Sequence, residues 1–337
     1  MPQKMPEMLQ VADAERLVVL ENRFTTGAGM AAALKDDIVQ NSRFSHPKVL
    51  ASRENPADTL NELGENLRDG DLLYLLTGDG VGNTVAQFAG DQDAPQFATM
   101  FGPLGNARNN YKATVGEKYR DLSPSRLLSL GDTDPIWPLR ARVEGPQSYT
   151  RLGLSIISVG AIATGAAVLE EPKHRNNRLR KNEHTRYPYE IYLSLFKALP
   201  KTRTLEVADE NGGNVRPLLD LFAAHAPEIG KAASFDHAMT DEEFLLGTIK
   251  DRAPWHLGLG MLRLMRGNFP VEHRKPGQEA ASFRLTHSRH NKTAMIQFDG
   301  EPQALAMGST VSLDQVGPED ATHRAVAAVT VREDRLA

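Results

Sequence analysis

The most informative part of the sequence is Asp71-Leu72-Leu73-Tyr74-Leu75-Leu76-Thr77-Gly78-Asp79-Gly80-Val81-Gly82-Asn83. Its first six residues form a short apolar run, which is typical of a buried strand, and the glycines behind it indicate a sharp turn. Glycine has no Cβ, so the backbone can turn there and approach a ligand closely. The next residues predict a helix that begins near Asn83. A helix N-terminus behind such a turn offers N–H groups and the positive end of its dipole, which suits phosphate.

The acid inside this turn, Asp79, sharpens the interpretation. A carboxylate repels phosphate unless a divalent cation or a proton transfer accompanies it. The pattern therefore favours metal-assisted phosphoryl chemistry over simple anion binding. Because Gly-Asp-Gly triplets also occur in ordinary surface turns, a turn without any ligand is the alternative.

Composition places the chain in a broad class. With 337 residues it is long enough for two domains, and 40% hydrophobic with 24% charged residues is typical of a soluble globular protein. The net charge of −4 gives no electrostatic argument for nucleic-acid binding, so none is expected. The absence of cysteine excludes disulfides, thiolate catalysis and cysteine-ligated zinc, and it fits a cytoplasmic protein.

Targeting and membrane signals are weak. The N-terminal residues lack the apolar stretch of a signal peptide. The most apolar window, residues 152–169, contains three glycines and several hydroxyl groups, and charged residues flank it closely. We interpret it as a buried strand followed by a helix of small residues, and we expect no transmembrane segment.

The first part of the chain alternates strands and helices. Strands are predicted at residues 16–22, 48–52 and 71–76, and helices at 30–41, 56–68 and from about 83. This alternation indicates βαβ units, and therefore a parallel sheet with flanking helices and ligands at the carboxyl ends of its strands.

After about residue 132 the pattern becomes β-rich. Strands are predicted at residues 136–143, 149–159, 203–207, 279–286 and 292–298, interrupted by helices near 160–170, 174–198 and 242–267. We therefore predict an α/β domain over residues 1–132 and a second, β-rich domain over 133–313. The tail from about 314 to 337 is expected to return to the first domain.

Two further features stand out. Glycine-bearing loops follow candidate strands at residues 22–29, 77–83 and 102–110, and several such loops on one sheet edge are harder to dismiss than one. Far downstream, Asp299-Gly300-Glu301 follows the last predicted strand. In isolation the Asp-Gly pair is best interpreted as a hairpin turn.

Taken together and in order, these motifs resemble the diacylglycerol kinase catalytic fold. Bacterial lipid kinases and sphingosine kinases share this fold, and NAD kinase is related to it. The family's Gly-Gly-Asp-Gly-Thr-x-Asn loop is similar to residues 77–83, its Pro-Leu-Gly-Thr to Pro103-Leu104-Gly105-Asn106, and its Asn-Pro-x-x-Gly loosely to residues 22–27. Its Ser-x-Gly is similar to Ser158-Val159-Gly160, and its Asp-Gly-Glu to Asp299-Gly300-Glu301.

The resemblance implies an ATP-dependent lipid kinase that uses Mg²⁺. Residues 1–132 would be the nucleotide-binding domain, and residues 133–313 would be a β-sandwich that holds the lipid acceptor. Glu301 would accept the proton of the acceptor hydroxyl, Asp299 would support it, and Asp79 would lie by the phosphates and the metal. Both motifs would then face one cleft. The remaining nucleotide contacts implied are Asn22, Thr26, Ser52, Thr77, Gly78, Gly80, Asn83 and Asn106.

The chain also departs from the family pattern. Val81 and Asn106 stand where the family has threonines, Thr77 replaces a glycine, and Arg23 replaces a proline. The two lost hydroxyl donors keep open a nucleotide-binding regulatory protein without turnover. A second alternative is an NAD kinase-like enzyme, because NAD kinases share the Gly-Asp-Gly loop.

Partners follow from the expected substrate. A basic run over residues 173–186, followed by three tyrosines, is commonly a solvated helix face. It also suits an anionic membrane surface, so transient, peripheral membrane contact is expected. A homo-oligomer is left open.

Overall fold

The computed structural model describes residues 9–22, 28–44, 46–53, 55–104, 109–116, 119, 121–170, 206–208, 216–225, 228–229, 233–234, 243–250, 271–275, 281–287 and 293–331. The chain divides into two compact units. The first contains Met1–Pro138 and Val316–Ala337, and the second contains Leu139–Gln315. The sequence-based boundaries were 132/133 and 313/314.

The first unit is built on a six-stranded sheet in the order β2-β1-β3-β4-β19-β5. Its strands are β1 (Arg16–Glu21), β2 (Lys48–Ala51), β3 (Asp71–Leu76), β4 (Ala98–Phe101), β5 (Gly131–Ile136) and β19 (Val326–Val331). The first five in this order run parallel, and β5 pairs antiparallel with β19. The C-terminal segment therefore contributes a strand to the sheet of the N-terminal part.

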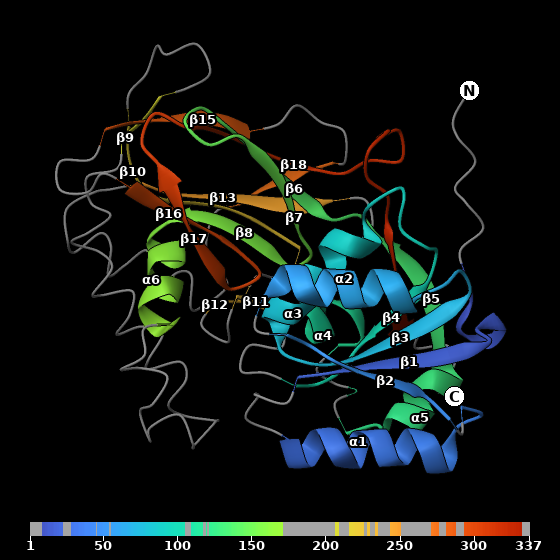
Figure 1. Cartoon of the computed structure of the whole chain (residues 1–337). Coiled ribbons are helices and arrows are strands. Elements are labelled where there is room, and N and C mark those ends of the chain that lie inside the picture. The colour runs from blue at the N-terminus through green and yellow to red at the C-terminus, as the bar shows by residue number, and fades with distance from the viewer. Residues whose placement is uncertain are drawn as a thin grey trace. The chain divides into compact units, whose positions relative to one another are not determined.

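Helices cover both faces of this sheet (Figure 1). They are the 3₁₀ helix η1 (Val11–Asp13) and the α-helices α1 (Ala28–Asn41), α2 (Pro56–Asn66), α3 (Asp79–Ala89), α4 (Asn109–Thr114) and α5 (Pro124–Leu130). Helices α1 and α5 lie on one face, and α2, α3 and α4 lie on the other (Figure 1). Because both faces are covered, β3 is buried at every position and carries a continuous apolar run instead of an alternating one.

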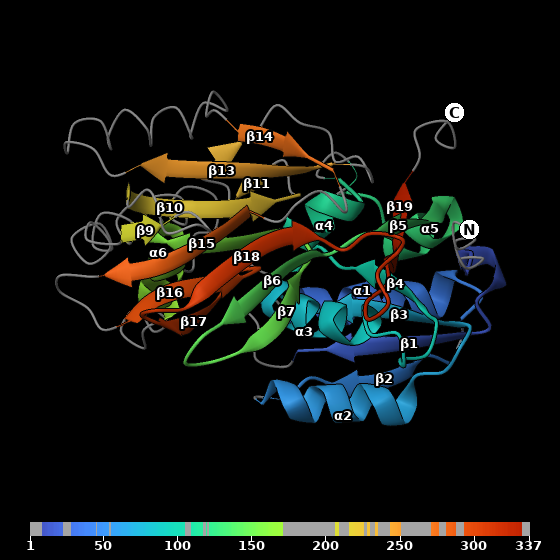
Figure 2. The same ribbon diagram turned by 90° about the horizontal axis from the view of Figure 1, so that it is seen from above.

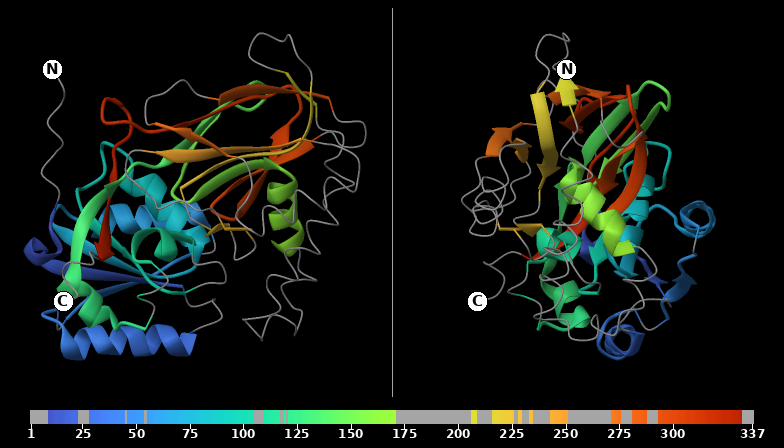
Figure 3. Two further views of the ribbon diagram at one scale, coloured as in Figure 1. Left: turned by 180° about the vertical axis from the view of Figure 1, so that it is seen from behind. Right: turned by 90° about the vertical axis from the view of Figure 1, so that its left-hand side faces the viewer.

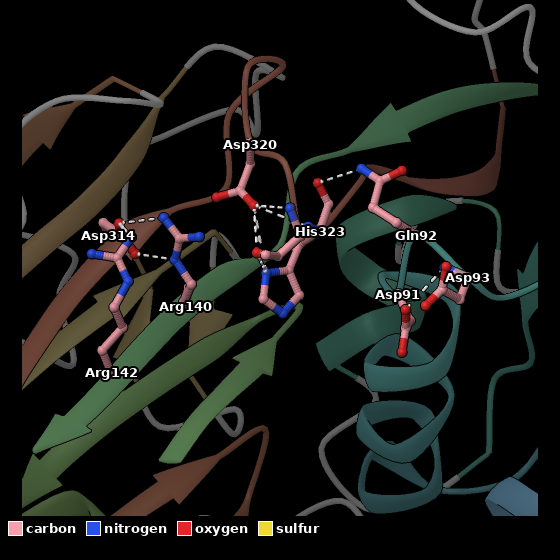
Figure 4. A network of polar contacts seen from close by, with 9 residues as sticks. Asp91, Gln92, Asp93, Arg140, Arg142, Asp314, Asp320 and His323 are labelled. Atoms are coloured by element: carbon pink, nitrogen blue, oxygen red, sulfur yellow. Dashed lines mark hydrogen bonds and ion pairs between the residues drawn. The ribbon is translucent and has the colours of Figure 1, made fainter. Parts of the chain in front are cut away.

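The segment before β19 is fastened to the end of α3. Arg324 donates its backbone N–H to Gly90 O (2.9 Å), and its guanidinium donates to the carbonyls of Ala94 and Pro95. Gln92 donates its side-chain amide to the carbonyl of His323 (Figure 4). These contacts hold residues 323–324, which precede β19, against the loop of residues 90–95 that follows α3.

The second unit is formed mainly by antiparallel strands. They are β6 (Leu139–Glu144), β7 (Tyr149–Gly153), β8 (Ile156–Gly160), β9 (Glu206–Ala208), β10 (Arg216–Ala224), β11 (Glu228–Ile229), β12 (Ala233–Ser234), β13 (Phe244–Lys250), β14 (Val271–Arg274), β15 (Ala281–His287), β16 (Thr293–Phe298), β17 (Glu301–Ala306) and β18 (Thr310–Gln315). Strands β11 and β12 form a separate pair. The main path of the large sheet runs β17-β16-β8-β10-β9-β15-β18-β6-β7, with β13 paired to β10 and β14 paired to β13 (Figure 2).

One hydrophobic core is shared by both halves of this sheet. Alternate residues of each strand point into it, as with Leu139, Ala141 and Val143 of β6 or Ala294, Ile296 and Phe298 of β16. Because side chains alternate along a strand, one face of each contributing strand meets this core, and the sheet curls around it. The contributing strands are β6, β8, β10, β13, β15, β16, β17 and β18. On the outer face, Arg140 of β6 forms a bidentate ion pair with Asp314 of β18 (Figure 4).

A single described helix of this unit, α6 (Ala161–Glu170), packs against β8, β16 and β17 (Figure 3). Its N-terminus is capped from another strand: the backbone N–H of Ile162 donates to Oδ2 of Asp220 on β10 over 2.5 Å. Asp220 is fully buried, and burial raises the pKa of its carboxyl well above the usual value, against the opposing effect of the Ile162 hydrogen bond. Among the described residues, no partner meets its Oδ1.

Two expectations from the sequence are wrong. Helix α3 begins at Asp79, not near Asn83, so Gly80 and Gly82 belong to the helix instead of a turn. The helix predicted over 242–267 is contradicted at β13, where Phe244–Lys250 pairs with β10 and β14. The rest of that range, the predicted helix at 174–198 and the basic run at 173–186 lie outside the described residues.

The predicted strand and small-residue helix over 152–169 are confirmed as the end of β7, β8 and α6. Within the described part of the chain, no helix has both the length and the apolar character needed to span a membrane.

Candidate functional site

The carboxyl ends of the parallel strands are linked in a row. The backbone N–H of Ser52, after β2, donates to Glu21 O of β1 (2.8 Å), and that of Asn22, after β1, donates to Leu76 O of β3 (3.1 Å). The backbone N–H of Gly102, after β4, donates to Leu75 O of β3 (2.9 Å). The structure thus brings Asn22, Ser52 and the start of the Thr77 loop to one edge of the sheet, where open α/β sheets bind ligands.

Helix α3 begins directly at this edge. Gly78 is its N-cap residue in an extended conformation (φ −80°, ψ 174°), and a glycine has no side chain with which to cap. The first helical hydrogen bond runs from Gly82 N to Gly78 O (3.2 Å). The N–H groups of Asp79, Gly80 and Val81 precede it, so the helix itself gives them no acceptor. Such N–H groups, together with the helix dipole, form an anion site.

Polar side chains at this edge are held close to the backbone. Ser52 and Thr77 are each 5% exposed, and Asn83 is fully buried. The hydroxyl of Thr77 donates to Gly78 O over 3.3 Å, and that of Thr84 donates to Gly80 O over 3.5 Å. The threonine that replaces the family's first glycine therefore bonds within its own loop.

Two glycines permit close approach around this helix. A Cβ on Gly82 would lie 2.6 Å from Nδ2 of Asn110, at the start of α4. A Cβ on Gly102 would lie 2.6 Å from Leu75 O, which is backbone and cannot yield easily. The glycines are thus explained by packing within the α/β layer, and Gly82 is needed although it lowers helix propensity.

An ion pair that sequence reasoning missed lies next to this row. Nζ of Lys35 on α1 lies 2.6 Å from Oε1 of Glu21, the last residue of β1. Lys35 lies six residues beyond the glycine-bearing loop at residues 22–29, so no local signal in the sequence identifies it. The pair fixes the end of β1, from which Asn22 follows.

Several predicted site residues remain outside this description. Thr26 and Asn106 lie outside the described residues, and of Asp79 only the backbone, at the first position of α3, is described. Among the residues whose side chains are described, no three of His, Asp or Glu cluster as a metal site would require. The assignment of Asp79 to metal or phosphate thus stays a prediction.

The second candidate site is the tip of the β16–β17 hairpin. Phe298 pairs with Glu301, which leaves a two-residue loop of Asp299 and Gly300. Both have positive φ, 51° and 96°, as a type I′ turn requires. The Asp-Gly hairpin signal in the sequence is therefore confirmed.

Asp299 does not face solvent at this tip. It is 2% exposed, and its Oδ1 accepts hydrogen bonds from Ser155 N, Ser155 Oγ and Ile156 N over 2.7, 2.6 and 2.9 Å. Its Oδ2 accepts one from Leu154 N over 2.8 Å. Asp299 therefore fastens the hairpin tip to the connection between β7 and β8.

Glu301 is placed differently. Its side chain is 38% exposed, and its Oε2 lies 3.4 Å from Nη2 of Arg151 on β7. Of the two acids, Glu301 is thus the one that a substrate can reach. That this hairpin shares a cleft with the N-terminus of α3 stays a prediction.

Comparisons with known proteins support the fold. No family model matches the chain, and no curated protein matches it. Two solved structures from Bacillus anthracis str. Sterne, both provisionally named diacylglycerol kinases, align with TM-scores of 0.62 and 0.59 at 13% and 15% identity. They cover 96% of this chain and 97% and 99% of their own chains.

A third structure, of a diacylglycerol kinase from the same organism, aligns with a TM-score of 0.56 at 10% identity and covers 96% of this chain and 98% of its own. A yeast NADH kinase complexed with NADH reaches a TM-score of only 0.47, on which we base nothing. The fold predicted from the motifs, a parallel sheet with flanking helices followed by antiparallel sheets, is therefore confirmed.

Proposed function

We propose that this protein is an ATP-dependent lipid kinase that phosphorylates a hydroxyl of a diacylglycerol-like or sphingoid lipid. The observation that carries the proposal is the uncapped N-terminus of α3, which begins at the carboxyl edge of the parallel sheet directly after β3. It is supported by the likeness of the whole fold to structures named diacylglycerol kinases.

The nucleotide would bind at the row of strand ends. The N–H groups of Gly80 and Val81 suit phosphate oxygens, and Ser52 and Asn22 at the same edge would contact the rest of the nucleotide. The residues present fit ATP in this respect, since the edge offers backbone donors and the acid described there, Glu21, is paired with Lys35. Mg²⁺ would neutralise the charge that builds up on the transferred phosphoryl group, and Asp79 is the carboxylate nearest in sequence to hold it.

The acceptor would be activated at the hairpin. Glu301 takes the proton of the lipid hydroxyl while the oxygen of that hydroxyl forms a bond to the γ-phosphorus of ATP. The bond from that phosphorus to the bridging oxygen breaks, and ADP leaves with the electron pair. A base of this kind must lie within hydrogen-bond reach of the hydroxyl, and the partial exposure of Glu301 allows that. Asp299 keeps the hairpin in place without touching the substrate.

The lipid would be reached at a membrane surface by transient, peripheral contact. A protein that phosphorylates a lipid must visit the bilayer without crossing it. Vesicle flotation with anionic and neutral lipids tests this contact directly, and retention by anionic vesicles alone is the expected result.

The decisive experiment incubates the protein with radiolabelled ATP and a cellular lipid extract, and separates products by polarity. A labelled lipid that depends on Mg²⁺ and on the protein is the expected result. Label that appears only in a water-soluble dinucleotide selects the NAD kinase-like alternative. ATP binding without any labelled product selects a regulatory protein, a reading that Val81 in the first turn of α3 motivates.

A further inference from the structure

Arg151 contacts three residues of the β16–β17 hairpin from another strand. Its Nη2 lies 3.4 Å from Glu301 Oε2, its Nη1 donates to Gln303 Oε1 over 3.3 Å, and its guanidinium carbon lies 4.8 Å from the centroid of the Phe298 ring. Strands β7 and β17 stand at the two ends of the sheet's main path. Arg151 therefore joins two edges that backbone hydrogen bonds do not connect.

The contacts fix the plane of the guanidinium. Phe298 is fully buried, so its ring provides a fixed face for a stacked cation, and Gln303 fixes a second direction. Arg151 is itself only 25% exposed on its side chain. A guanidinium held in this way offers Glu301 a cation in a defined position, which a mobile surface lysine would not.

We propose that Arg151 is the positioning residue for Glu301 in the phosphoryl transfer, an inference that rests on the proposed function. A glutamate side chain has several rotatable bonds, and a base works only when it is held close to the proton that it takes. The contact from Arg151 engages Oε2. It leaves Oε1 as the oxygen that we assign to the acceptor hydroxyl.

A double-mutant cycle tests this assignment. Turnover of radiolabelled ATP with the lipid extract in detergent micelles is measured for the unmodified protein, Arg151→Gln, Glu301→Gln and the double variant. We expect Arg151→Gln to lower turnover by about 10–100-fold and to leave the KM for ATP within about twofold. In the Glu301→Gln background the same change should have no further effect, because Arg151 acts through that carboxylate.

Arg142→Gln is the matched control. Arg142 lies on the neighbouring strand β6, pairs with Asp314 over 2.9 Å and is 44% exposed, but it belongs to the outer face of the sheet. Its loss should leave turnover within about twofold, since an exposed ion pair of this kind contributes little. Arg151→Lys should recover part of the activity, because lysine keeps the charge but not the planar fork.

The outcomes distinguish the role of Arg151 from the proposed kinase function. Losses that multiply in the double variant, or an Arg151→Gln turnover equal to that of Arg142→Gln, overturn the inference and leave the proposed function intact. A Glu301→Gln variant as active as the unmodified protein overturns the assignment of Glu301 and the inference with it, but leaves the proposed function intact. No transfer by the unmodified protein overturns the proposed function. Should Arg151→Gln unfold at the assay temperature, Arg151→Lys carries the same cycle.

Discussion

The carboxylate of Asp299 accepts two hydrogen bonds from Ser155, one from its backbone N–H (2.7 Å) and one from its hydroxyl (2.6 Å), although the residues are 144 positions apart in the chain. Two more come from the N–H groups of Leu154 and Ile156. A single buried carboxylate thus accepts hydrogen bonds from all three backbone N–H groups of residues 154–156, which connect β7 to β8. This contact holds the hairpin that carries Glu301. Asp299 therefore contributes to stability, whereas the proposed chemistry falls to Glu301.

The first prediction follows from this division. Asp299→Asn replaces one acceptor oxygen by an amide that faces a buried N–H, so we expect the free energy of unfolding to fall by about 2–4 kcal/mol. Ser155→Ala removes only a hydroxyl and should cost about 1 kcal/mol. Urea unfolding of both variants measures the difference. A smaller loss for Asp299→Asn than for Ser155→Ala would contradict the anchoring role.

The second prediction compares two glycines of the first unit. Gly102→Ala places a Cβ 2.6 Å from Leu75 O, and the backbone must shift, so we expect a loss of about 1–3 kcal/mol. Gly64→Ala on α2 meets only Phe88, at 3.8 Å, and should instead stabilise by about 0.5–1 kcal/mol through helix propensity. Thermal unfolding of the pair tests this: equal midpoints would mean that the end of β4 tolerates a side chain.

The third prediction concerns pH. Burial raises the pKa of Asp220 above its value in the unfolded chain. The folded form therefore binds the proton more tightly, its contribution to stability is full below the unfolded pKa of about 3.9, and it is lost as pH rises through the folded pKa. Asp220→Asn removes this dependence and keeps an oxygen to cap α6. The free energy of unfolding of the variant, minus that of the unmodified protein, should therefore be larger at pH 8 than at pH 5. Urea unfolding of both proteins at the two pH values measures this difference. If this difference in unfolding free energy were the same at both pH values, the Asp220 carboxyl would titrate alike in the folded and unfolded chain.

The sequence predicted local features well and distant ones poorly. The strand Asp71–Leu76 and the Asp299-Gly300 hairpin were predicted from short patterns because a few neighbouring residues determine them. The start of α3 was misplaced because glycine normally disfavours helix, whereas Gly82 is required by its closeness to Asn110.

Strand β13 was mistaken for helix because its pairing with β10 lies outside any local window. For the same reason the partners of Glu301 escaped notice. Arg151 lies 150 residues before it, and only the curl of the sheet brings the two together.

The fourth prediction addresses the phosphate loop. Asp79→Asn keeps the shape of the side chain and removes its charge at the start of α3, so we expect phosphoryl transfer to be abolished while the fold persists. Asp91→Asn is the control, since Asp91 is an exposed aspartate that follows Gly90, the C-cap residue at the other end of α3. Circular dichroism checks the fold and the radiolabel assay measures transfer. Turnover of Asp79→Asn within a factor of two of the unmodified protein would end the assignment.

The last prediction concerns the proton acceptor. Glu301→Gln preserves size and a hydrogen-bonding oxygen but removes the basic carboxylate, so turnover should fall by about 10²–10⁴-fold with little change in the ATP dissociation constant. Glu272→Gln is the matched control, because Glu272 is also a strand glutamate paired with an arginine, Arg274, at 2.9 Å, and is more exposed. If Glu301 were only the tip of a hairpin, both variants would behave alike. A selective loss for Glu301→Gln, with ATP affinity kept, assigns the proton transfer to the one acid of the hairpin that its own fold leaves accessible.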